Sequence, residues 1–323
     1  MRKLVFGCLA SLVLYAGLFG FVLDRPLTYG FLSDMIDARL ARGASISGPK
    51  LVLLAGSNSL YSHSCETIEP VLGMPCVNGG AVVGIGLDYL FKRWDAVLHH
   101  GDIVYLPMEQ AQDIRTRTAS ALGPDAAILF RHDWRTLAEL SPRRWVAAVF
   151  SFDLRASVMS VIETAIRQGP SYDLLATQPG TSNAWGDHIG HTEAKAAEYR
   201  SSLTTLRAYS ATSAQIAAGD GSAEIADFVA LMSARGVIVI GGLPTGFDDL
   251  PQSDALIAVI AAVYTDHGGW FLALHNLSRY PRVNFFDSPD HLNETEQQAH
   301  SVLVAKALAE MLGRPAQLQA LAR

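Results

Sequence analysis

The sequence predicts a three-layer α/β/α fold, with a parallel sheet of about five strands and helices on both of its faces. Short apolar runs without charges, each about as long as one strand, recur along the chain, and such runs are typical of strands buried on both faces. Stretches with helical spacing of apolar residues separate them, as crossover connections between parallel strands require. The chain has 323 residues, of which 50% are hydrophobic, so it can form a large core.

The first 24 residues differ in kind from the rest. Arg2 and Lys3 precede Leu4–Leu23, an uncharged stretch that is long enough to span a bilayer as one helix. Because basic flanks stay on the cytoplasmic side, we expect a single-pass anchor that holds the rest of the chain outside the cytoplasm. A cleaved signal peptide is the alternative, although no small-residue cleavage site follows the stretch. Lipidation of Cys8 is a further alternative, without a convincing lipobox around it.

Residues 25–49 are expected to link this segment to the folded part, residues 50–323. The net charge of −6 includes no basic excess, so nucleic acid is not expected as a partner. No Cys/His spacing matches a structural zinc site, and no metal or other cofactor is expected. Outside the cytoplasm Cys65 and Cys76 can form a disulfide, and two buried free thiols are the alternative.

The folded part begins with a strand at Lys50–Ala55, where an apolar run ends in a glycine turn. A helix is expected to follow from Asn58 to Leu72, because Gly73 then stops it. Met74–Val77 is predicted as a second, short strand, and it too ends in a glycine-rich turn.

Residues 87–98 carry an apolar stripe at helical spacing, and the apolar run Ile103–Leu106 predicts a third strand. The following residues, about 110–235, are predicted as a mainly helical insertion, with helices over 125–140, 142–168 and 194–217 and an irregular loop over 169–191.

The sheet is expected to resume at Gly236–Gly242, followed by a helix at Asp254–Thr265. Val283–Phe286 is predicted as the last strand. The closing helix is expected at Glu294–Gly313, because Gly313 and Pro315 are stop signals.

Three of the turns are expected at the carboxyl edge of the sheet, where open α/β sheets bind their ligands. Ser57 lies in the first turn, Asn78 and Gly79 in the second, and Asp287 and His291 in the third. A serine becomes a nucleophile when a histidine accepts its proton, and a carboxylate orients that histidine. These residue types therefore predict a catalytic triad of Ser57, His291 and Asp287.

The same turns can stabilise a developing oxyanion. The backbone N–H groups of Ser57 and Gly79 and the side chain of Asn78 are the expected donors. Gly56 and Asn58 are expected beside them, in contact with the oxyanion or the substrate. The alternative is an ordinary β–α turn whose serines cap the helix.

These three turns resemble sequence blocks of the SGNH (GDSL-type) hydrolase superfamily. Ala55-Gly56-Ser57-Asn58 resembles its nucleophile turn, and Val77-Asn78-Gly79-Gly80 resembles the block that usually supplies an oxyanion glycine. Phe286–Asn293 resembles its aspartate–histidine block. With its N-terminal anchor the chain is similar to the acyl-transfer branch that O-acetylates alginate and cellulose or moves D-alanine onto teichoic acid. The resemblance covers about Leu51–Glu109 and Val237–Leu312.

The resemblance implies a flavodoxin-like sheet and a Ser57 acyl-enzyme. It implies transfer of an acyl group, such as acetyl, to a hydroxyl of an envelope or exported polysaccharide. The chain would sit on a bacterial inner membrane with its catalytic domain in the periplasm, and a membrane-bound O-acyltransferase would supply the acyl groups. An esterase of the same superfamily is an alternative, as is a catalytically silent protein that binds polysaccharide or scaffolds a secretion complex.

The chain also departs from the pattern of this superfamily. Gly56 stands where the G-D-S form has aspartate, and Pro107-Met108-Glu109 appears in place of the block in which simple esterases have an asparagine that serves as an oxyanion donor. Asp287 and His291 are four residues apart rather than three, which makes Asp290 a rival for the triad. Ser59 is an alternative nucleophile if the turn is shifted by two residues.

Asp187, His188 and His191 suggest either a metal site or, as we prefer, a loop with surface histidines. If that loop folds over the sheet edge, Asp187 or His188 can contact a substrate. Other candidates are two residues that can line the pocket and two tryptophans that either stack on sugar rings or are partly buried: Tyr61, Glu109, Trp185 and Trp270.

Overall fold

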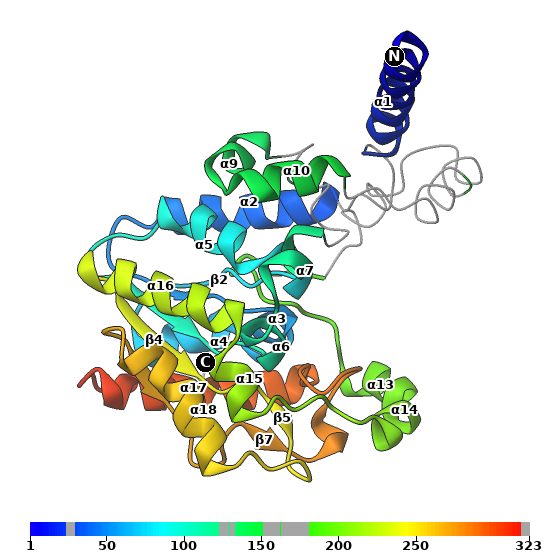
Figure 1. Cartoon of the computed structure of the whole chain (residues 1–323). Coiled ribbons are helices and arrows are strands. Elements are labelled where there is room, and N and C mark those ends of the chain that lie inside the picture. The colour runs from blue at the N-terminus through cyan, green and yellow to red at the C-terminus, as the bar shows by residue number, and fades with distance from the viewer. Residues whose placement is uncertain (24–29, 123–128, 130–132, 151–161, 163–180, 318–323) are drawn as a thin grey trace. The chain divides into compact units, whose positions relative to one another are not determined.

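The computed structural model describes residues 1–23, 30–122, 129, 133–150, 162 and 181–317 (Figure 1). The chain forms two compact units, of which one comprises residues 1–35 and 118–179 and the other residues 36–117 and 180–323. The second unit contains the sheet and every residue of the predicted site. The predicted insertion is thus divided: residues 118–179 group with the N-terminal residues, and residues 110–117 and 180–235 group with the sheet.

The described part of the first unit is helical. Three helices lie within it: α1 (Arg2–Leu23), α9 (Trp134–Glu139) and α10 (Pro142–Phe150). Two more, α2 (Gly30–Ser45) and α7 (Arg117–Leu122), include residues of both units. Among the described residues no helix has the length and apolarity that crossing a bilayer requires, so the anchor expected for residues 1–24 is not supported by the structure.

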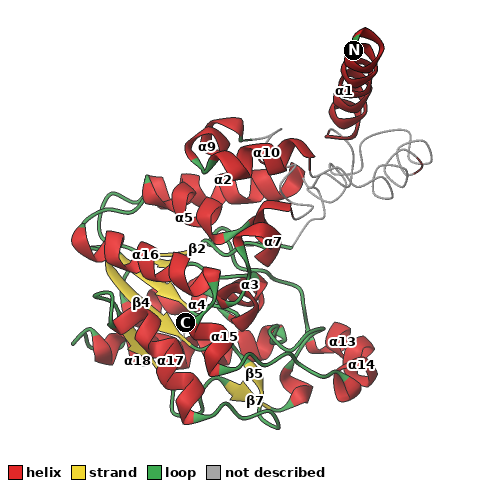
Figure 2. Ribbon diagram, in the orientation of Figure 1, coloured by secondary structure: helices red, strands yellow, loops and turns green. Residues whose placement is uncertain are grey.

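The second unit is built on a five-stranded sheet in which every pairing is parallel, as predicted (Figure 2). In spatial order its strands are β2 (Cys76–Asn78), β1 (Leu51–Leu53), β3 (Ile103–Leu106), β4 (Ile238–Gly242) and β6 (Trp270–Leu272). The chain crosses from β1 to one side and then returns to place β3 on the other. Such a switch point, between β1 and β3, is where doubly wound sheets bind ligands.

The longer helices of this unit are α4 (Cys65–Leu72), α5 (Leu87–Asp95), α16 (Asp220–Ala234), α17 (Asp254–Thr265) and α18 (Glu294–Met311). Its short elements are α3 (Ser57–Ser62), η2 (Val83–Ile85), α6 (Gln110–Asp113), α13 (Glu193–Ala196), η3 (Ala197–Tyr199), α14 (Arg200–Thr205), α15 (Ser213–Ala217) and η4 (Arg282–Asn284), with a two-stranded sheet of β5 (Gly246–Phe247) and β7 (Arg279–Tyr280).

Helices cover both faces of the sheet. Alternate strand residues such as Leu51 and Ile240 pack with α4 and α18 in one core cluster. On the other face α16 packs against β4, α5 and α17. The rings of Phe91 in α5 and Phe228 in α16 stack there with centroids 4.1 Å apart. The alternation of side chains along each strand decides which residues join which layer.

One predicted strand was wrong. Val283–Phe286 does not join the main sheet, because η4 takes up its first residues and Phe285 instead bridges to Leu292 in an antiparallel pair. The fifth strand is β6, which the sequence did not predict. It has only three residues and lies at the sheet edge with Trp270 42% exposed. The apolar run of residues 270–274 that contains it had been assigned to no element.

Several predicted helices are shorter than expected. The helix expected from Asn58 to Leu72 is two helices, because Ser64 caps a new one by accepting a hydrogen bond from Thr67 N. The helix expected over 194–217 is broken into α13, α14 and α15, and α16 was not predicted. Residues 181–191 form the irregular loop that was predicted, while 169–180 and parts of the helices over 125–140 and 142–168 lie outside the described residues.

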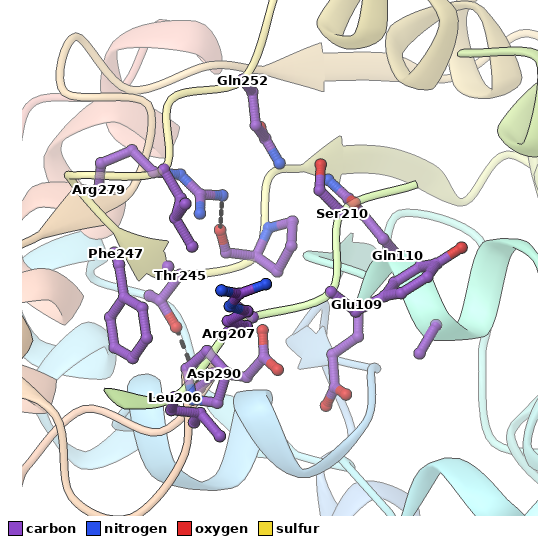
Figure 3. Close-up of a pocket in the computed structure, with 17 residues that line it drawn as sticks. Glu109, Gln110, Leu206, Arg207, Ser210, Thr245, Phe247, Gln252, Arg279 and Asp290 are labelled. Carbon is purple, nitrogen blue, oxygen red and sulfur yellow. Dashed lines mark hydrogen bonds between the residues drawn. The ribbon is translucent and has the colours of Figure 1, made fainter. Parts of the chain in front are cut away.

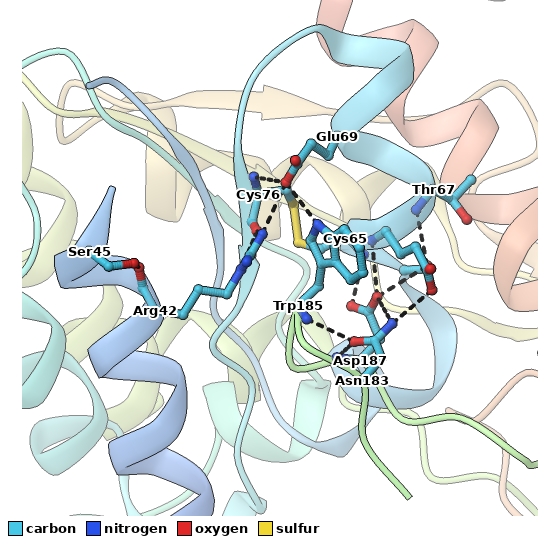
Figure 4. Close-up of polar contacts among 11 residues, drawn as sticks. Arg42, Ser45, Cys65, Thr67, Glu69, Cys76, Asn183, Trp185 and Asp187 are labelled. Carbon is cyan, nitrogen blue, oxygen red and sulfur yellow. Dashed lines mark hydrogen bonds and ion pairs between the residues drawn. A yellow bond between two sulfur atoms is a disulfide. The ribbon is translucent and has the colours of Figure 1, made fainter. Parts of the chain in front are cut away.

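The loop of residues 181–191 is tied to the sheet by a buried carboxylate (Figure 4). Asp187 accepts hydrogen bonds from Ser64 Oγ, Cys65 N, Glu66 N, Asn78 Nδ2 and Asn183 Nδ2. Close by, Cys65 and Cys76 form a disulfide that joins α4 to β2, which is one of the two states expected for these cysteines. The loop is thereby fixed to the start of α4 and the end of β2.

A buried ion pair joins the starts of β1 and β3. Lys50 Nζ lies 2.7 Å from Asp102 Oδ2, and the two side chains are only 1% and 2% exposed. Asp102 also accepts hydrogen bonds from the backbone N–H groups of Lys50 and His99. Breaking such a pair leaves one buried charge without a partner, which costs several kcal/mol.

We therefore expect Asp102→Asn to lower the free energy of unfolding by about 3–5 kcal/mol, as measured by urea denaturation of the full chain. The matched control is Asp95→Asn, which breaks the more exposed pair with Arg235 and should cost less than about 1 kcal/mol. Equal losses in the two variants would contradict the importance given to the buried pair.

Candidate active site

Ser57 stands where β1 has ended and α3 begins. Gly56 and Asn58 beside it are buried, whereas Ser57 is partly exposed. Ser59, the alternative nucleophile, is completely buried, and its hydroxyl donates to Gly56 O at 2.9 Å. Ser57 is therefore the serine of this turn that a substrate can reach.

His291 and Asp287 lie on one closed turn. Phe286 N donates to His291 O at 2.8 Å, and Phe285 and Leu292 bridge at the base of the turn. His291 Nε2 lies 2.8 Å from Ser57 Oγ, and His291 Nδ1 lies 2.7 Å from Asp287 Oδ1. The structure thus brings together the three predicted residues in the order serine, imidazole, carboxylate, with the distances that proton transfer needs.

The serine and histidine segments are joined by side chains that the sequence analysis did not single out. The Ser62 hydroxyl lies 2.8 Å from Asp290 O and accepts a hydrogen bond from Leu292 N at 3.2 Å. Thr245 Oγ1 also donates to Asp290 O. No sequence pattern marks Ser62, because its partners in the turn are 228 and 230 positions away.

Asp290, the rival for the triad, faces elsewhere. It lines a pocket beside the triad rather than bonding to His291. Burial, and then the nearby Glu109, raise the pKa of the Asp290 carboxyl to about 7. The carboxylate that holds the imidazole of His291 is that of Asp287.

The predicted oxyanion donors of the second turn are engaged elsewhere. Asn78 Nδ2 donates to Ser59 O at 2.7 Å and to Asp187 Oδ1 at 3.1 Å, and Gly79 N donates to Leu53 O in continuation of the sheet. The structure therefore does not bring Asn78 and Gly79 together with Ser57 as donors. Their hydrogen bonds instead connect the second turn to α3, to β1 and to the loop of residues 181–191.

The Glu109 side chain contacts the turn that carries Ser57. Its Oε1 accepts a hydrogen bond from Asn58 N at 3.0 Å and lies 3.5 Å from Ser57 Oγ. Gly56 permits this approach, since a Cβ there would lie 2.3 Å from Glu109 Oε1. The Gln112 side chain accepts from both Gly56 N and Glu109 N. Position alone had suggested Glu109 as a pocket residue, and the structure adds its contact with Ser57.

Aromatic rings support the histidine of the triad. The ring of Tyr61 stacks on that of His291 with centroids 4.1 Å apart and on that of His188 with centroids 4.0 Å apart. His188 Nδ1 lies 3.1 Å from His191 Nδ1. Burial lowers the pKa of both His188 and His191 to about 4, so both are neutral at neutral pH.

The expectation of surface histidines at 188 and 191 was wrong for His191, which is completely buried. The reason is that the loop packs on α3 and α18, where His188 N donates to Leu60 O and Glu294 N donates to His191 O. Across the described residues no group of three metal-ligating side chains is disposed to hold a metal ion.

The remaining candidates for substrate contact are held away from the triad. Asp187 is buried and fully engaged by its donors. Trp185 Nε1 donates to Glu69 Oε2, and the guanidinium of Arg42 lies over the Trp185 ring in a cation–π contact. Trp270 begins β6, the edge strand, which is separated from β1 and Ser57 by β3 and β4.

A pocket of about 210 Å³ opens beside the triad (Figure 3). Its lining includes Glu109, whose Oε1 lies 3.5 Å from Ser57 Oγ, and Asp290. Arg207, Arg279 and Gln252 are among its other polar residues. Burial lowers the pKa of Arg279 to about 10, and its guanidinium donates to Pro244 O. Gln252 Oε1 is a buried oxygen to which no partner in the described structure donates. The pocket therefore offers both hydrogen-bond donors and acceptors to a polar ligand.

Comparison of the chain with protein-family models, with curated proteins and with solved structures finds no match. Conclusions about its chemistry therefore come from the geometry of this site.

The geometry distinguishes the two aspartates of the histidine turn. We expect Asp287→Asn to lower the kcat for an activated ester by about 10⁴, because the imidazole loses the carboxylate that sets its tautomer. Asp290→Asn, the matched control on the same turn, should retain at least a tenth of the parent kcat at pH 7. The reverse ranking would assign the triad to Asp290.

Proposed function

We propose that this chain transfers an acyl group, such as acetyl, from Ser57 to a hydroxyl group of a polysaccharide outside the cytoplasm. The observation that carries this proposal is the pair of hydrogen-bond distances, 2.8 Å from Ser57 Oγ to His291 Nε2 and 2.7 Å from His291 Nδ1 to Asp287 Oδ1. The resemblance of the three turns to SGNH-type acyl-transfer proteins agrees with it. Ser57 is also the partly exposed residue of a buried turn.

The reaction follows from these contacts. His291 Nε2 takes the proton of Ser57 as Oγ attacks the carbonyl carbon of the acyl donor, and Asp287 stabilises the resulting imidazolium. The leaving group then takes that proton, and the acyl group remains on Ser57 as an ester. His291 next accepts the proton of an acceptor hydroxyl, which attacks the ester. The bond to Ser57 breaks, Ser57 recovers a proton from His291, and the product is the acylated acceptor.

The pocket beside Glu109 is the proposed binding site for the acceptor. It shares Glu109 with the nucleophile turn, since Oε1 of that residue lies 3.5 Å from Ser57 Oγ. The side-chain oxygen Oε1 of Gln252 has no donor in the described structure, and the guanidinium of Arg207 also lines the pocket. Both groups suit a ligand with many hydroxyl groups. An acceptor hydroxyl bound at the Glu109 end lies near the acylated serine.

The disulfide between Cys65 and Cys76 supports a location outside the cytoplasm, where disulfides persist. The location that we propose is the periplasmic side of a bacterial inner membrane, reached through the apolar N-terminal segment. A membrane-bound O-acyltransferase is the proposed source of acyl groups, as the resemblance implies.

The nucleophile can be identified with an activated acetyl ester and the full chain. We expect Ser57→Ala to reduce turnover by about 10⁴–10⁶ and to abolish an acetyl group that mass spectrometry detects on the Ser57 peptide of the parent. Ser59→Ala is the matched control on the same turn and should keep both signals within about tenfold of the parent. If all three proteins behave alike and none is acetylated, the triad is inactive and polysaccharide binding or scaffolding becomes the better account.

The acceptor site can be tested by Gln252→Leu, which keeps the size of the side chain and removes its acceptor oxygen. We expect the KM for an oligosaccharide acceptor to rise about three- to tenfold, the effect of one hydrogen bond. Hydrolysis of the same acyl-enzyme by water serves as the control and should not change. An unchanged KM across neutral and uronic oligosaccharides would move the acceptor site elsewhere, and hydrolysis without any transfer would make the chain an esterase.

A further inference from the structure

The carboxyl group of Glu109 lies next to Ser57, where the proposed reaction forms an oxyanion. When Ser57 Oγ attacks a carbonyl carbon, the carbonyl oxygen becomes negatively charged within hydrogen-bond reach of the nucleophile turn. The backbone N–H of Asn58 belongs to this turn, but it donates to Glu109 Oε1 at 3.0 Å. The same oxygen lies 3.5 Å from Ser57 Oγ. The carboxyl group of Glu109 therefore lies beside the position where the oxyanion is expected.

The Glu109 carboxyl is fixed in this position. The Glu109 side chain is buried, with a residue exposure of 8%. Gln112 Oε1 accepts from Gly56 N at 2.9 Å and from Glu109 N at 3.2 Å, which ties the residue to the nucleophile turn. The absence of a side chain at Gly56 leaves room for the carboxyl, because a Cβ would lie 2.8 Å from Glu109 Cδ.

The two charge states of this group have opposite effects on the reaction. An ionised carboxylate repels a developing oxyanion and accepts the N–H that could stabilise it. A neutral carboxyl can instead donate its O–H, as a carboxylic acid kept neutral in an apolar site does. We propose that Glu109, as a neutral carboxyl group, donates the hydrogen bond that stabilises the oxyanion, and that its ionisation blocks the site.

The surroundings of Glu109 favour the neutral form. Burial raises its pKa, whereas the hydrogen bond from Asn58 N, the nearby His291 and the Ser57 hydroxyl act in the opposite direction. Asp290 is the other carboxyl on this wall of the pocket, and the nearby Glu109 raises its pKa. Arg279 faces Asp290 and favours its ionised form.

The inference rests on the proposed function, and it adds a donor to the reaction without adding a step. Ser57 gives its proton to His291, the two electrons of the carbonyl π bond move to the oxygen, and that oxygen accepts a hydrogen bond from the neutral Glu109. When the intermediate collapses, the carbonyl re-forms and the leaving group takes the proton from His291. Glu109 keeps its proton throughout.

The test is the pH dependence of acylation in the full chain. In the parent, kcat/KM for an activated acetyl ester should fall on the alkaline side of its profile as the pH rises through the raised pKa of Glu109, because the neutral carboxyl is present below that pKa and lost above it. Glu109→Gln keeps a neutral donor at every pH, so we expect a lower rate at acid pH but no alkaline fall. Glu109→Ala removes the donor and should lose about 10²–10³ in rate at all pH values.

Asp290→Asn separates the two carboxyls. If the alkaline fall disappears in Asp290→Asn and persists in Glu109→Gln, or if Glu109→Gln and Glu109→Ala lose the same rate with an unchanged profile, the inference is wrong. Infrared spectroscopy provides a readout that does not depend on turnover. A carboxylic acid C=O band that is lost on raising the pH and absent from Glu109→Gln is expected, and a band unaltered by that substitution would count against the inference.

The failure of the inference can be distinguished from failure of the proposed function. If the parent shows no acetyl group on Ser57, the proposed function fails and the inference fails with it. If Ser57 is acetylated and Ser57→Ala is inactive, but Glu109→Gln retains the alkaline fall, only the role of Glu109 is overturned.

Discussion

The hydrogen bonds of the Ser62 hydroxyl are the interaction on which the candidate site depends. Ser62 ends the short helix that begins with Ser57, and its hydroxyl contacts Asp290 O and Leu292 N on either side of His291. The alignment of Ser57 Oγ with the imidazole is therefore set by a buried polar contact between two distant segments. Because an unmade buried hydrogen bond is costly, this contact favours one arrangement of the two.

The other side of the nucleophile helix depends on a second polar centre. The Asp187 carboxylate is buried, and five donors from α4, β2 and its own loop offset the cost of removing it from water. The loop that it fixes carries His188, which stacks on Tyr61, and Tyr61 in turn stacks on His291. The triad and the loop of residues 181–191 are thus connected by hydrogen bonds and ring stacking. Asn78, the predicted oxyanion donor, belongs to the same network because it donates to Asp187.

Carboxyl groups give this site its electrostatic character. Asp287 contacts the imidazole of His291, while Glu109 and Asp290 line the pocket next to Ser57. Packing buried carboxyls close to one another is unfavourable for folding and makes neutral forms more stable. Sites where a local rule of this kind is broken are often functional. Here these carboxyl groups lie at the switch point of the sheet, beside the partly exposed Ser57.

The sequence by itself determined the α/β class, the parallel sheet and the triad of Ser57, Asp287 and His291, because apolar runs and strand-end turns are local patterns. Other features depended on tertiary contacts. The sequence did not reveal β6 or the bridge at Phe285, since short strands are defined by their neighbours. It also assigned Asn78 as an oxyanion donor, whereas its amide donates to Ser59 O and Asp187 Oδ1, and it suggested Glu109 only as a pocket residue. The chemical type of a side chain is local information, but its hydrogen-bond partners are set by segments that only folding brings together.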